Sequence, residues 1–298
     1  MVSTMLHVPV MSKEVLNCLN LKAGDCTVDC TLGIGGHAMQ VLKATTPDGR
    51  LIGIDRDGES LALAQERLKE FSGRCHFIRK DFRYIDQVLD GLCIPEVDNM
   101  LFDLGISSYQ MENPQRGFSI KSDGPLDMRM DKDSYISAYD LVNSLSEREI
   151  SLILRDFGQE RWHNRIASYL VKQREHNPIE STQTLSDMVL RAIPRHQHQK
   201  IHPATRTFQA FRIAVNRELE ALEIALDKSV RYLKVGGRLC VIAFHSLEDK
   251  IVKEKFNHFA KQGTSKLIFK KPLRPSTREA DENPRCRSAR LRAMERTK

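Results

Sequence analysis

The first hundred residues alternate between short apolar stretches and amphipathic stretches, and this alternation limits the fold more than any other feature. Strands are expected at residues 26–32, 49–57, 75–82 and 97–105. Helices are expected between them, at residues 36–45 and 58–71. Strands that alternate with helices build a parallel sheet with helices packed on its faces. The sequence therefore predicts an α/β fold.

A glycine-rich turn, VDCTLGIGGHA at residues 28–38, joins the first expected strand to the first expected helix. A strand, a glycine turn and a helix start together present backbone N–H groups to a ligand. A Walker phosphate loop is excluded, because no lysine follows these glycines. The turn matches the G-x-G-x-x-G pattern of NAD sites only imperfectly. The third alternative is S-adenosylmethionine, whose binding loop occupies the same place in a related sheet.

Acidic residues stand at the ends of all four expected strands, namely Asp29, Asp55, Asp81 and Asp103. Asp29 precedes the glycines, where a carboxylate can organise the turn and face the ammonium of a methionine. Asp55 can accept hydrogen bonds from ribose hydroxyls, and the ring of Phe82 can pack on a purine. One such aspartate is more often a turn residue or a helix cap. Four in register indicate a ligand site at the carboxyl edge of the sheet, which favours S-adenosylmethionine.

The alternation stops after residue 108. Residues 109–133 have no usable period, although their Phe118, Leu126, Met128 and Met130 argue against disorder. A capping box at Ser146 and Glu149 predicts a helix start, and further helices are expected at 160–176 and 182–193. We therefore predict a discontinuous α/β domain, residues 1–108 and 206–298, interrupted by a helical domain at 109–205.

The α/β pattern resumes near residue 208. Apolar residues spaced by three and four predict one long helix from 208 to 233. It is followed by Gly236-Gly237 and by an expected strand in RLCVIAFHS, residues 238–246. This order of helix, glycine pair and strand is typical of methyltransferase folds.

The charge is distributed unevenly. The chain has a net charge of +7, and residues 266–298 contain 11 Lys and Arg against 4 Asp and Glu. The rest of the chain is therefore balanced, and a polyanion such as nucleic acid is the expected partner of the basic tail. The alternative is a solvated edge.

The seven cysteines form no CxxC pair, which favours reduced thiols in the cytoplasm. No membrane span or signal peptide is expected.

Many long segments of the chain resemble one family, the MraW/RsmH family of small-subunit ribosomal RNA cytosine-N4 methyltransferases. The matching segments are HVPVM (7–11), VDCTLGIGGH (28–37), GIDRD (53–57), DLGISS (103–108), RGFS (116–119), GPLDMRMD (124–131), HPATRTFQAFRI (202–213), GGRLCVIAFHSLED (236–249) and NPRCRSARLRAMER (283–296). Departures are few: Cys30 stands where the family often has glycine, and Leu32 and Ile34 stand where Phe and Arg are common.

The resemblance implies a class I S-adenosylmethionine-dependent methyltransferase, Rossmann-like and mostly parallel, with an inserted helical substrate-recognition domain. It implies methylation of N4 of a cytosine in the decoding region of 16S ribosomal RNA, with the small ribosomal subunit as partner. The cofactor, S-adenosyl-L-methionine, would be bound by residues carried over from the motifs. These are Gly35, Gly36, His37, Asp55, Phe82, Asp103 and Gln110.

The nitrogen that accepts the methyl group is a poor nucleophile. The N4 lone pair of cytosine is delocalised into the ring, so acceptors aimed at its hydrogens would favour the pyramidal nitrogen that attacks. The [DSN]-P-P-[FYW] segment that usually serves amino-methylating enzymes is absent, and DLGISSYQ stands in its place. We predict Asp103, Ser107 and Ser108 as catalytic residues. The two serines could instead merely cap the turn.

A base must leave its stack to be methylated. The candidate contacts to such an RNA are Arg116, Asp127, Arg129, Arg206 and His245. Each of them could instead form an internal ion pair or a cap. The loose spacing of His196, His198 and His202 is weak evidence for a metal, and no metal is predicted. The sequence does not decide whether the chain forms a homodimer.

Two other functions remain as alternatives. One is a non-catalytic RNA-binding or assembly factor that keeps the fold, which would bind the cofactor without transferring its methyl group. The other is an NAD-dependent oxidoreductase, which the glycine spacing disfavours. Titration with S-adenosylhomocysteine and with NAD distinguishes a methyltransferase from an oxidoreductase.

Overall fold

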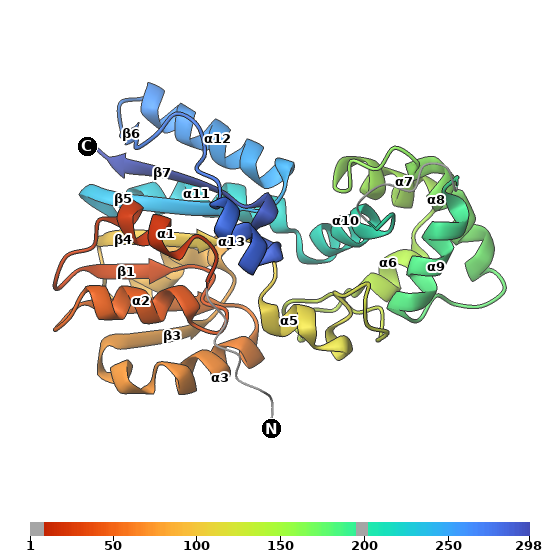
Figure 1. Ribbon diagram of the computed structural model, residues 1–298, viewed down its shortest axis with the longest axis horizontal. Helices are drawn as coiled ribbons and strands as arrows, with labels where there is room; N and C mark the ends of the chain where they lie inside the picture. Colours follow the sequence, from red (N-terminus) through yellow and green to blue (C-terminus); the bar gives the residue numbers. More distant parts are fainter. Residues whose placement is uncertain (1–8, 195–201) are drawn as a thin grey trace. The chain divides into compact units, whose positions relative to one another are not determined.

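The computed structural model describes residues 9–194 and 202–298 of the chain (Figure 1). The chain divides into two compact units. The sheet unit consists of Met1–Ser107 together with Leu219–Lys298, and the helical unit is Ser108–Glu218. The predicted insertion at 109–205 therefore ends too early, because residues 206–218 also belong to the helical unit.

The sheet unit is built on a seven-stranded sheet in the order β3-β2-β1-β4-β5-β7-β6. Its strands are β1 (Cys26–Asp29), β2 (Arg50–Asp55), β3 (Cys75–Arg79), β4 (Val97–Asp103), β5 (Leu233–Ala243), β6 (Ser265–Leu267) and β7 (Arg290–Arg296). The first five strands are parallel, as the sequence predicts, and β7 is antiparallel to both of its neighbours. The strand order reverses between β1 and β4, and open α/β sheets bind ligands at such a point.

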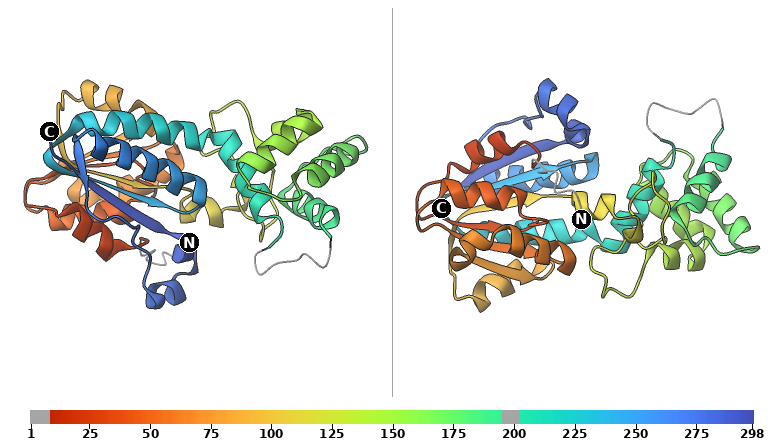
Figure 2. Two further views of the ribbon diagram at one scale, coloured as in Figure 1. Left: turned by 90° about the horizontal axis from the view of Figure 1, so that it is seen from above. Right: turned by 60° about the horizontal axis from the view of Figure 1, so that its bottom comes forward.

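Helices cover both faces of this sheet (Figure 2). One face packs against α4 (Ile85–Gly91), α11 (Glu218–Tyr232) and α12 (Ser246–Lys261). The other face packs against α1 (Ser12–Leu19), α2 (Gly36–Ala44) and α3 (Gly58–Arg67). The α13 helix (Thr277–Glu282) precedes β7.

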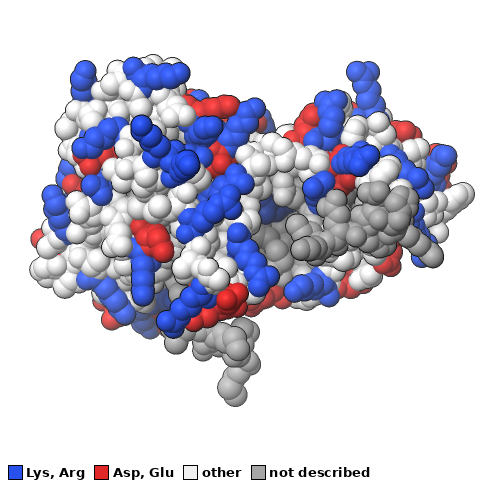
Figure 3. All heavy atoms as spheres, turned by 45° about the horizontal axis from the view of Figure 1, so that its top comes forward, with Lys and Arg blue, Asp and Glu red and all other residues white. Residues whose placement is uncertain are grey.

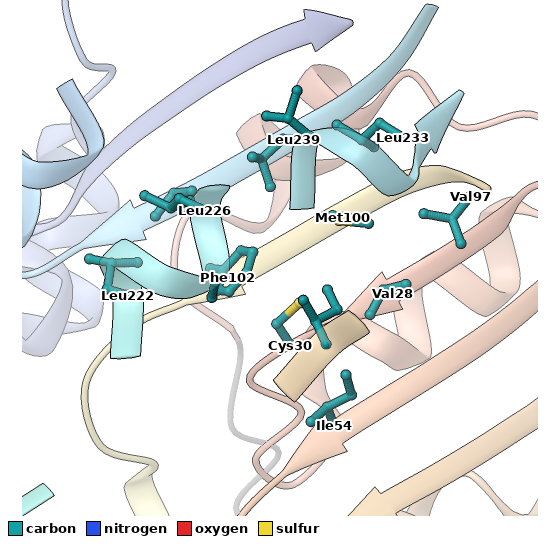
Figure 4. Packing of buried hydrophobic residues seen from close by; sticks show 14 of the residues in the cluster. Val28, Cys30, Ile54, Val97, Met100, Phe102, Leu222, Leu226, Leu233 and Leu239 are labelled. Carbon is teal, nitrogen blue, oxygen red and sulfur yellow. The ribbon is translucent and has the colours of Figure 1, made fainter. Parts of the chain in front are cut away.

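Strand residues divide between the two faces by simple alternation. Met100 and Phe102 of β4 face α11, whereas Leu101 between them faces the other core. Figure 4 shows Leu222 and Leu226 of α11 beside Phe102, in the same hydrophobic cluster. Because both faces are buried, the central strands are nearly continuous apolar runs, which is why they could be recognised in the sequence.

The helical unit contains α5 (Ser108–Glu112), α6 (Ala138–Ser144), α7 (Glu147–Asp156), α8 (His163–Arg174), α9 (Thr182–Ala192) and α10 (Thr205–Asn216). The predicted capping box is confirmed: the Ser146 side chain accepts from the Glu149 N–H, and the Glu149 carboxylate accepts from the Ser146 N–H. The helices expected at 160–176 and 182–193 correspond to α8 and α9.

The prediction of one long helix over 208–233 is wrong. Arg217 has φ 49° and ψ 42°, a left-handed conformation that ends α10 before α11 begins. The apolar spacing runs through this break without interruption. The spacing of apolar residues reports which face of a helix is buried. It does not show that the backbone at Arg217 leaves the helical conformation.

The segment 109–133 is ordered by buried side chains, although it contains only α5 and a one-turn helix. Phe118, Leu126, Met128 and Met130 are buried, as expected. The Asn216 side chain donates to the Met128 carbonyl and accepts from the Met130 N–H, both at 2.8 Å. These bonds satisfy backbone groups that no helix or strand pairs.

None of the helices in the described ranges is long and apolar enough to cross a membrane. All seven cysteines are free thiols, and five of them are buried.

Candidate functional site

The glycine turn between β1 and α2 is held by backbone hydrogen bonds to the neighbouring strands. The Cys30 N–H donates to the Leu101 carbonyl of β4, and the Leu32 N–H donates to the Ile54 carbonyl of β2. Gly33 and Gly35 have φ of 52° and 77°. Residues other than glycine adopt this left-handed conformation only at a cost, so the two glycines shape the turn.

Close packing is a second reason for a glycine at position 35. A Cβ at this position would lie 3.1 Å from the Leu68 side chain. A Cβ on Gly53 in β2 would lie 2.7 Å from Leu32, a residue of the turn. The turn is therefore pressed against β2 and against the residue that follows α3.

Gly35→Ala is expected to lower the affinity for S-adenosylhomocysteine by about tenfold, because left-handed strain of roughly 1–3 kcal/mol would move the turn. Isothermal titration calorimetry measures this affinity, and thermal denaturation reports the accompanying loss of stability. Gly91→Ala is the matched control, since Gly91 ends α4 and a Cβ there would meet nothing within 4 Å. Equal affinities for the two variants would contradict this account of the turn.

Asp55, at the end of β2, accepts two backbone hydrogen bonds. One carboxylate oxygen accepts from the Gly33 N–H at 2.7 Å, and the other accepts from the Asp57 N–H at 2.9 Å. Burial raises the pKa of Asp55 to about 6, and the two backbone donors oppose this rise. The residue expected to bind ribose thus also fixes the glycine turn.

Asp29, at the end of β1, is a buried carboxyl that accepts from the Thr31 N–H at 3.1 Å. Burial raises its pKa to about 7, with the nearby His37 acting in the opposite direction. Asp103 and Asp55 raise this pKa further by repulsion. Three carboxyl groups therefore gather at one edge, and a cation is the ligand that would relieve their repulsion.

His37 and Asp103 face each other across the same edge. His37 Nε2 lies 3.5 Å from Asp103 Oδ2, and the imidazole is only 6% exposed. Within the described ranges, neither His37 Nε2 nor Asp103 Oδ1 has a hydrogen-bond partner. Leaving such buried atoms unpaired costs roughly 1–3 kcal/mol each, so their presence indicates a polar ligand.

The ends of β3 and β4 complete the edge. Asp81 accepts from the Arg83 N–H and pairs with the guanidinium groups of Arg56 and Arg83, at 3.0 and 3.1 Å. Asp81 is therefore a structural turn residue. Phe82 is half-buried and packs edge-on against Phe102, with ring centroids 5.5 Å apart.

Thr31 is a residue of this edge that no sequence motif indicated. Its hydroxyl accepts from the Asp103 N–H at 2.6 Å and so ties the turn after β1 to the end of β4. A hydroxyl residue two positions before the first glycine of the turn was the available signal, but hydroxyls are common in turns for local reasons.

Comparison with known proteins now identifies the family. The model of the MraW methylase family matches residues 4–297. This chain belongs to the MraW methylase family. Curated relatives named ribosomal RNA small subunit methyltransferase H include one from Geotalea uraniireducens, 49% identical over 97% of this chain and 98% of the relative. Those from Geobacter sp. strain M21 and Halothermothrix orenii are 47% and 44% identical over the same shares of both chains.

Among solved structures, a putative methyltransferase from Streptococcus mutans in complex with SAH aligns with 97% of this chain and 99% of its own, at 11% identity and a TM-score of 0.47. As an MraW methylase, the chain is a methyltransferase with the class I fold, and its cofactor is S-adenosyl-L-methionine.

The site of this MraW methylase suits that cofactor. S-adenosylmethionine carries a cationic sulfonium and an ammonium group, and Asp29, Asp55 and Asp103 offer negative charge at one edge. The pyrophosphate of NAD would instead add negative charge there. His37 Nε2 could donate or accept a hydrogen bond and Asp103 Oδ1 could accept one, so both atoms suit a polar ligand.

The predicted cofactor and catalytic residues are divided between the two units. Gly35, Gly36, His37, Asp55, Phe82, Asp103 and Ser107 belong to the sheet unit. Ser107 lies against the glycine turn, its Cβ 3.7 Å from where a Gly33 Cβ would be. Ser108 and Gln110 are in α5 of the helical unit, and Gln110 is buried there.

Arg116 does not fit its predicted contact with RNA. Its side chain is buried, and its guanidinium donates to the carbonyls of Arg129 and Met130 at 3.0 and 2.8 Å. It also lies over the Phe118 ring. A cation used in this way supports the 109–133 segment from inside the helical unit.

Three of the other four residues predicted to contact RNA instead form an internal ion pair or a helix cap. Asp127 and Arg129 pair with each other at 2.7 Å. His245 caps α12, where its Nδ1 accepts from the Glu248 N–H at 3.4 Å. Arg206 is exposed, with one long bond to the Gln159 carbonyl. His196 and His198 lie outside the described residues, and the His202 Nδ1 accepts from the Ala204 N–H.

Proposed function

We propose that the chain methylates N4 of a cytosine in the decoding region of small-subunit (16S) ribosomal RNA, with S-adenosyl-L-methionine as donor. The observation that supports it most is that, among the described residues, two buried atoms beside the glycine turn, His37 Nε2 and Asp103 Oδ1, have no hydrogen-bond partner. The relatives' shared name supports a ribosomal RNA substrate. Such a substrate would place the activity in the cytoplasm, with the small subunit as partner.

The residues of the sheet unit would hold the cofactor by complementary charge and shape. When bound, the cofactor supplies a methyl group already activated by its sulfonium. Asp29 would face the ammonium, Asp55 the ribose hydroxyls and Phe82 the purine. The backbone of Gly35 and Gly36 would let the ligand approach closely.

Asp103 is proposed to act on the acceptor. Its carboxylate would accept a hydrogen bond from the cytosine amino group, which favours the pyramidal nitrogen and stabilises the positive charge that develops on it. Ser107 and Ser108 follow on the same turn and are proposed as further acceptors. His37, 3.5 Å from Asp103, would hold that carboxylate in position.

The direct test is transfer of labelled methyl from S-adenosylmethionine to small-subunit particles and to free 16S RNA, followed by nucleoside analysis. The expected product is N4-methylcytidine. Label in another nucleoside would overturn the proposed position, and label in no RNA, despite tight binding of S-adenosylhomocysteine, would favour the non-catalytic alternative. Binding of NAD in place of S-adenosylhomocysteine would favour an oxidoreductase.

A further inference from the structure

A basic segment connects the last two strands of the sheet unit. We define it as residues 270–287, which contain six Lys or Arg residues against three Asp or Glu. All six cations are exposed: Lys270, Lys271, Arg274, Arg278, Arg285 and Arg287. The face of the molecule drawn in Figure 3 likewise shows many more basic than acidic side chains.

The basic segment leads to the carboxyl edge of the sheet, where the cofactor site lies. Because β7 is antiparallel, its first residue, Arg290, pairs with Ala243 at the carboxyl end of β5. The Glu279 carboxylate of α13 also accepts from the Met11 N–H at 2.6 Å. Two residues earlier, Pro9 lies 3.3 Å from where a Cβ on Gly36 would stand, at the start of α2.

The basic segment is fixed to the core instead of trailing into solvent. The side chain of Cys286 is fully buried between Arg285 and Arg287, in the core beneath α1 and α2. Leu273 exchanges both backbone hydrogen bonds with Leu291 of β7, each 3.0 Å long. Because the backbone of this segment is already fixed, its cations cost less backbone entropy on binding a ligand than cations on a flexible tail would.

The cations of the basic tail differ in their partners. Five of the eleven have the following carboxylate partners: Arg290 and Arg292 pair with Asp249, Lys266 with Glu295, Arg278 with Glu282 and Arg296 with Glu96. Within residues 9–194 and 202–298, no carboxylate lies within ion-pair distance of Lys270, Lys271 or Arg274. These three have positive charge that no neighbouring acid neutralises.

We propose that Lys270, Lys271 and Arg274 bind backbone phosphates of the RNA whose base enters the cofactor edge. This inference rests on the proposed function and adds to it a binding surface on the sheet unit. A base held out of its stack needs its flanking backbone anchored, and phosphate contacts position RNA without reading its sequence. Arg274 offers a planar fork that suits a phosphate, and the two lysines act as point charges.

The test compares two triple variants that lose the same charge. The first is Lys270→Gln with Lys271→Gln and Arg274→Gln. The control is Lys22→Gln with Lys43→Gln and Lys261→Gln, three exposed lysines that lie near the opposite, amino edge. Fluorescence anisotropy with a 16S RNA fragment measures the RNA affinity over a range of salt concentrations.

The first variant is expected to bind RNA at least about tenfold more weakly than the control, with a salt dependence shallower by about 2 in the log–log slope, because each single-strand phosphate contact contributes about 0.7. Its affinity for S-adenosylhomocysteine should be unchanged. Equal RNA affinity and equal slopes for the two variants would overturn this surface, even if methyl transfer persists. If the unmodified protein does not methylate cytosine, the proposed function is wrong. The comparison of RNA affinities between the two variants would still test the RNA-binding surface.

Discussion

Asp103→Asn is expected to lower the rate of methyl transfer to RNA by about 10²–10³-fold, the typical cost of removing one aligned electrostatic group from a reacting centre. Asparagine keeps the size of the side chain but removes the negative charge that would stabilise the developing positive charge on N4. The change should act mainly on kcat, since the charge matters most in the transition state. Single-turnover transfer of labelled methyl measures it.

Asp48→Asn is the matched control for this prediction, because Asp48 is exposed in the turn before β2. It removes the same charge away from the carboxyl edge and should leave the rate unchanged. Thermal denaturation checks that both variants are folded. A rate for Asp103→Asn within about threefold of the unmodified protein would show that this carboxylate does not act on the acceptor.

Asp29→Asn is expected to stabilise the protein without cofactor, increasingly so as the pH rises. Burial raises the pKa of Asp29 to about 7 in the folded protein, from the ordinary aspartate value of 3.8. The free energy of unfolding therefore falls as the pH rises between these values, because the folded state binds the proton more tightly. At about 1.4 kcal/mol per pKa unit, the variant gains as much as about 4 kcal/mol at pH 8 and almost nothing near pH 4.

Urea denaturation of both proteins at pH 4.5, 6 and 8 measures this difference. The same substitution should weaken binding of the cofactor at pH 8, since the ammonium would lose its carboxylate partner. Greater stability together with weaker binding is the usual trade-off at a functional site. A stability difference that does not change with pH would refute the raised pKa, and unchanged cofactor binding would refute the contact with the ammonium.

The part of the fold that the sequence predicts well is the part with local signals. Gly33 and Gly35 need left-handed backbone, and the aspartates that end β1, β2 and β4 follow apolar runs that are buried on both sides. These signals are confined to a few consecutive residues. They therefore predicted both the strands and the edge at which we propose that the site lies.

The remainder depends on contacts between residues far apart in the sequence. β7 alternates arginines with apolar residues and so resembles a solvated tail, but Arg290 and Arg292 pair with Asp249, some forty residues earlier. Arg116 resembles an exposed RNA contact until the carbonyls of Arg129 and Met130 are seen to surround it. Only the folded chain shows which cations are already neutralised or buried.

The order of the strands also bears on how this chain folds during synthesis. The helical unit is one continuous stretch, so it can close as soon as its own residues have left the ribosome. The sheet unit is split around it, and β4 lacks the neighbour β5 until the helical unit has been translated. Until then the nascent chain must keep an apolar, unpaired strand edge from aggregating. The sheet can therefore be completed only late in synthesis, because the helical unit is inserted in the sequence between β4 and β5.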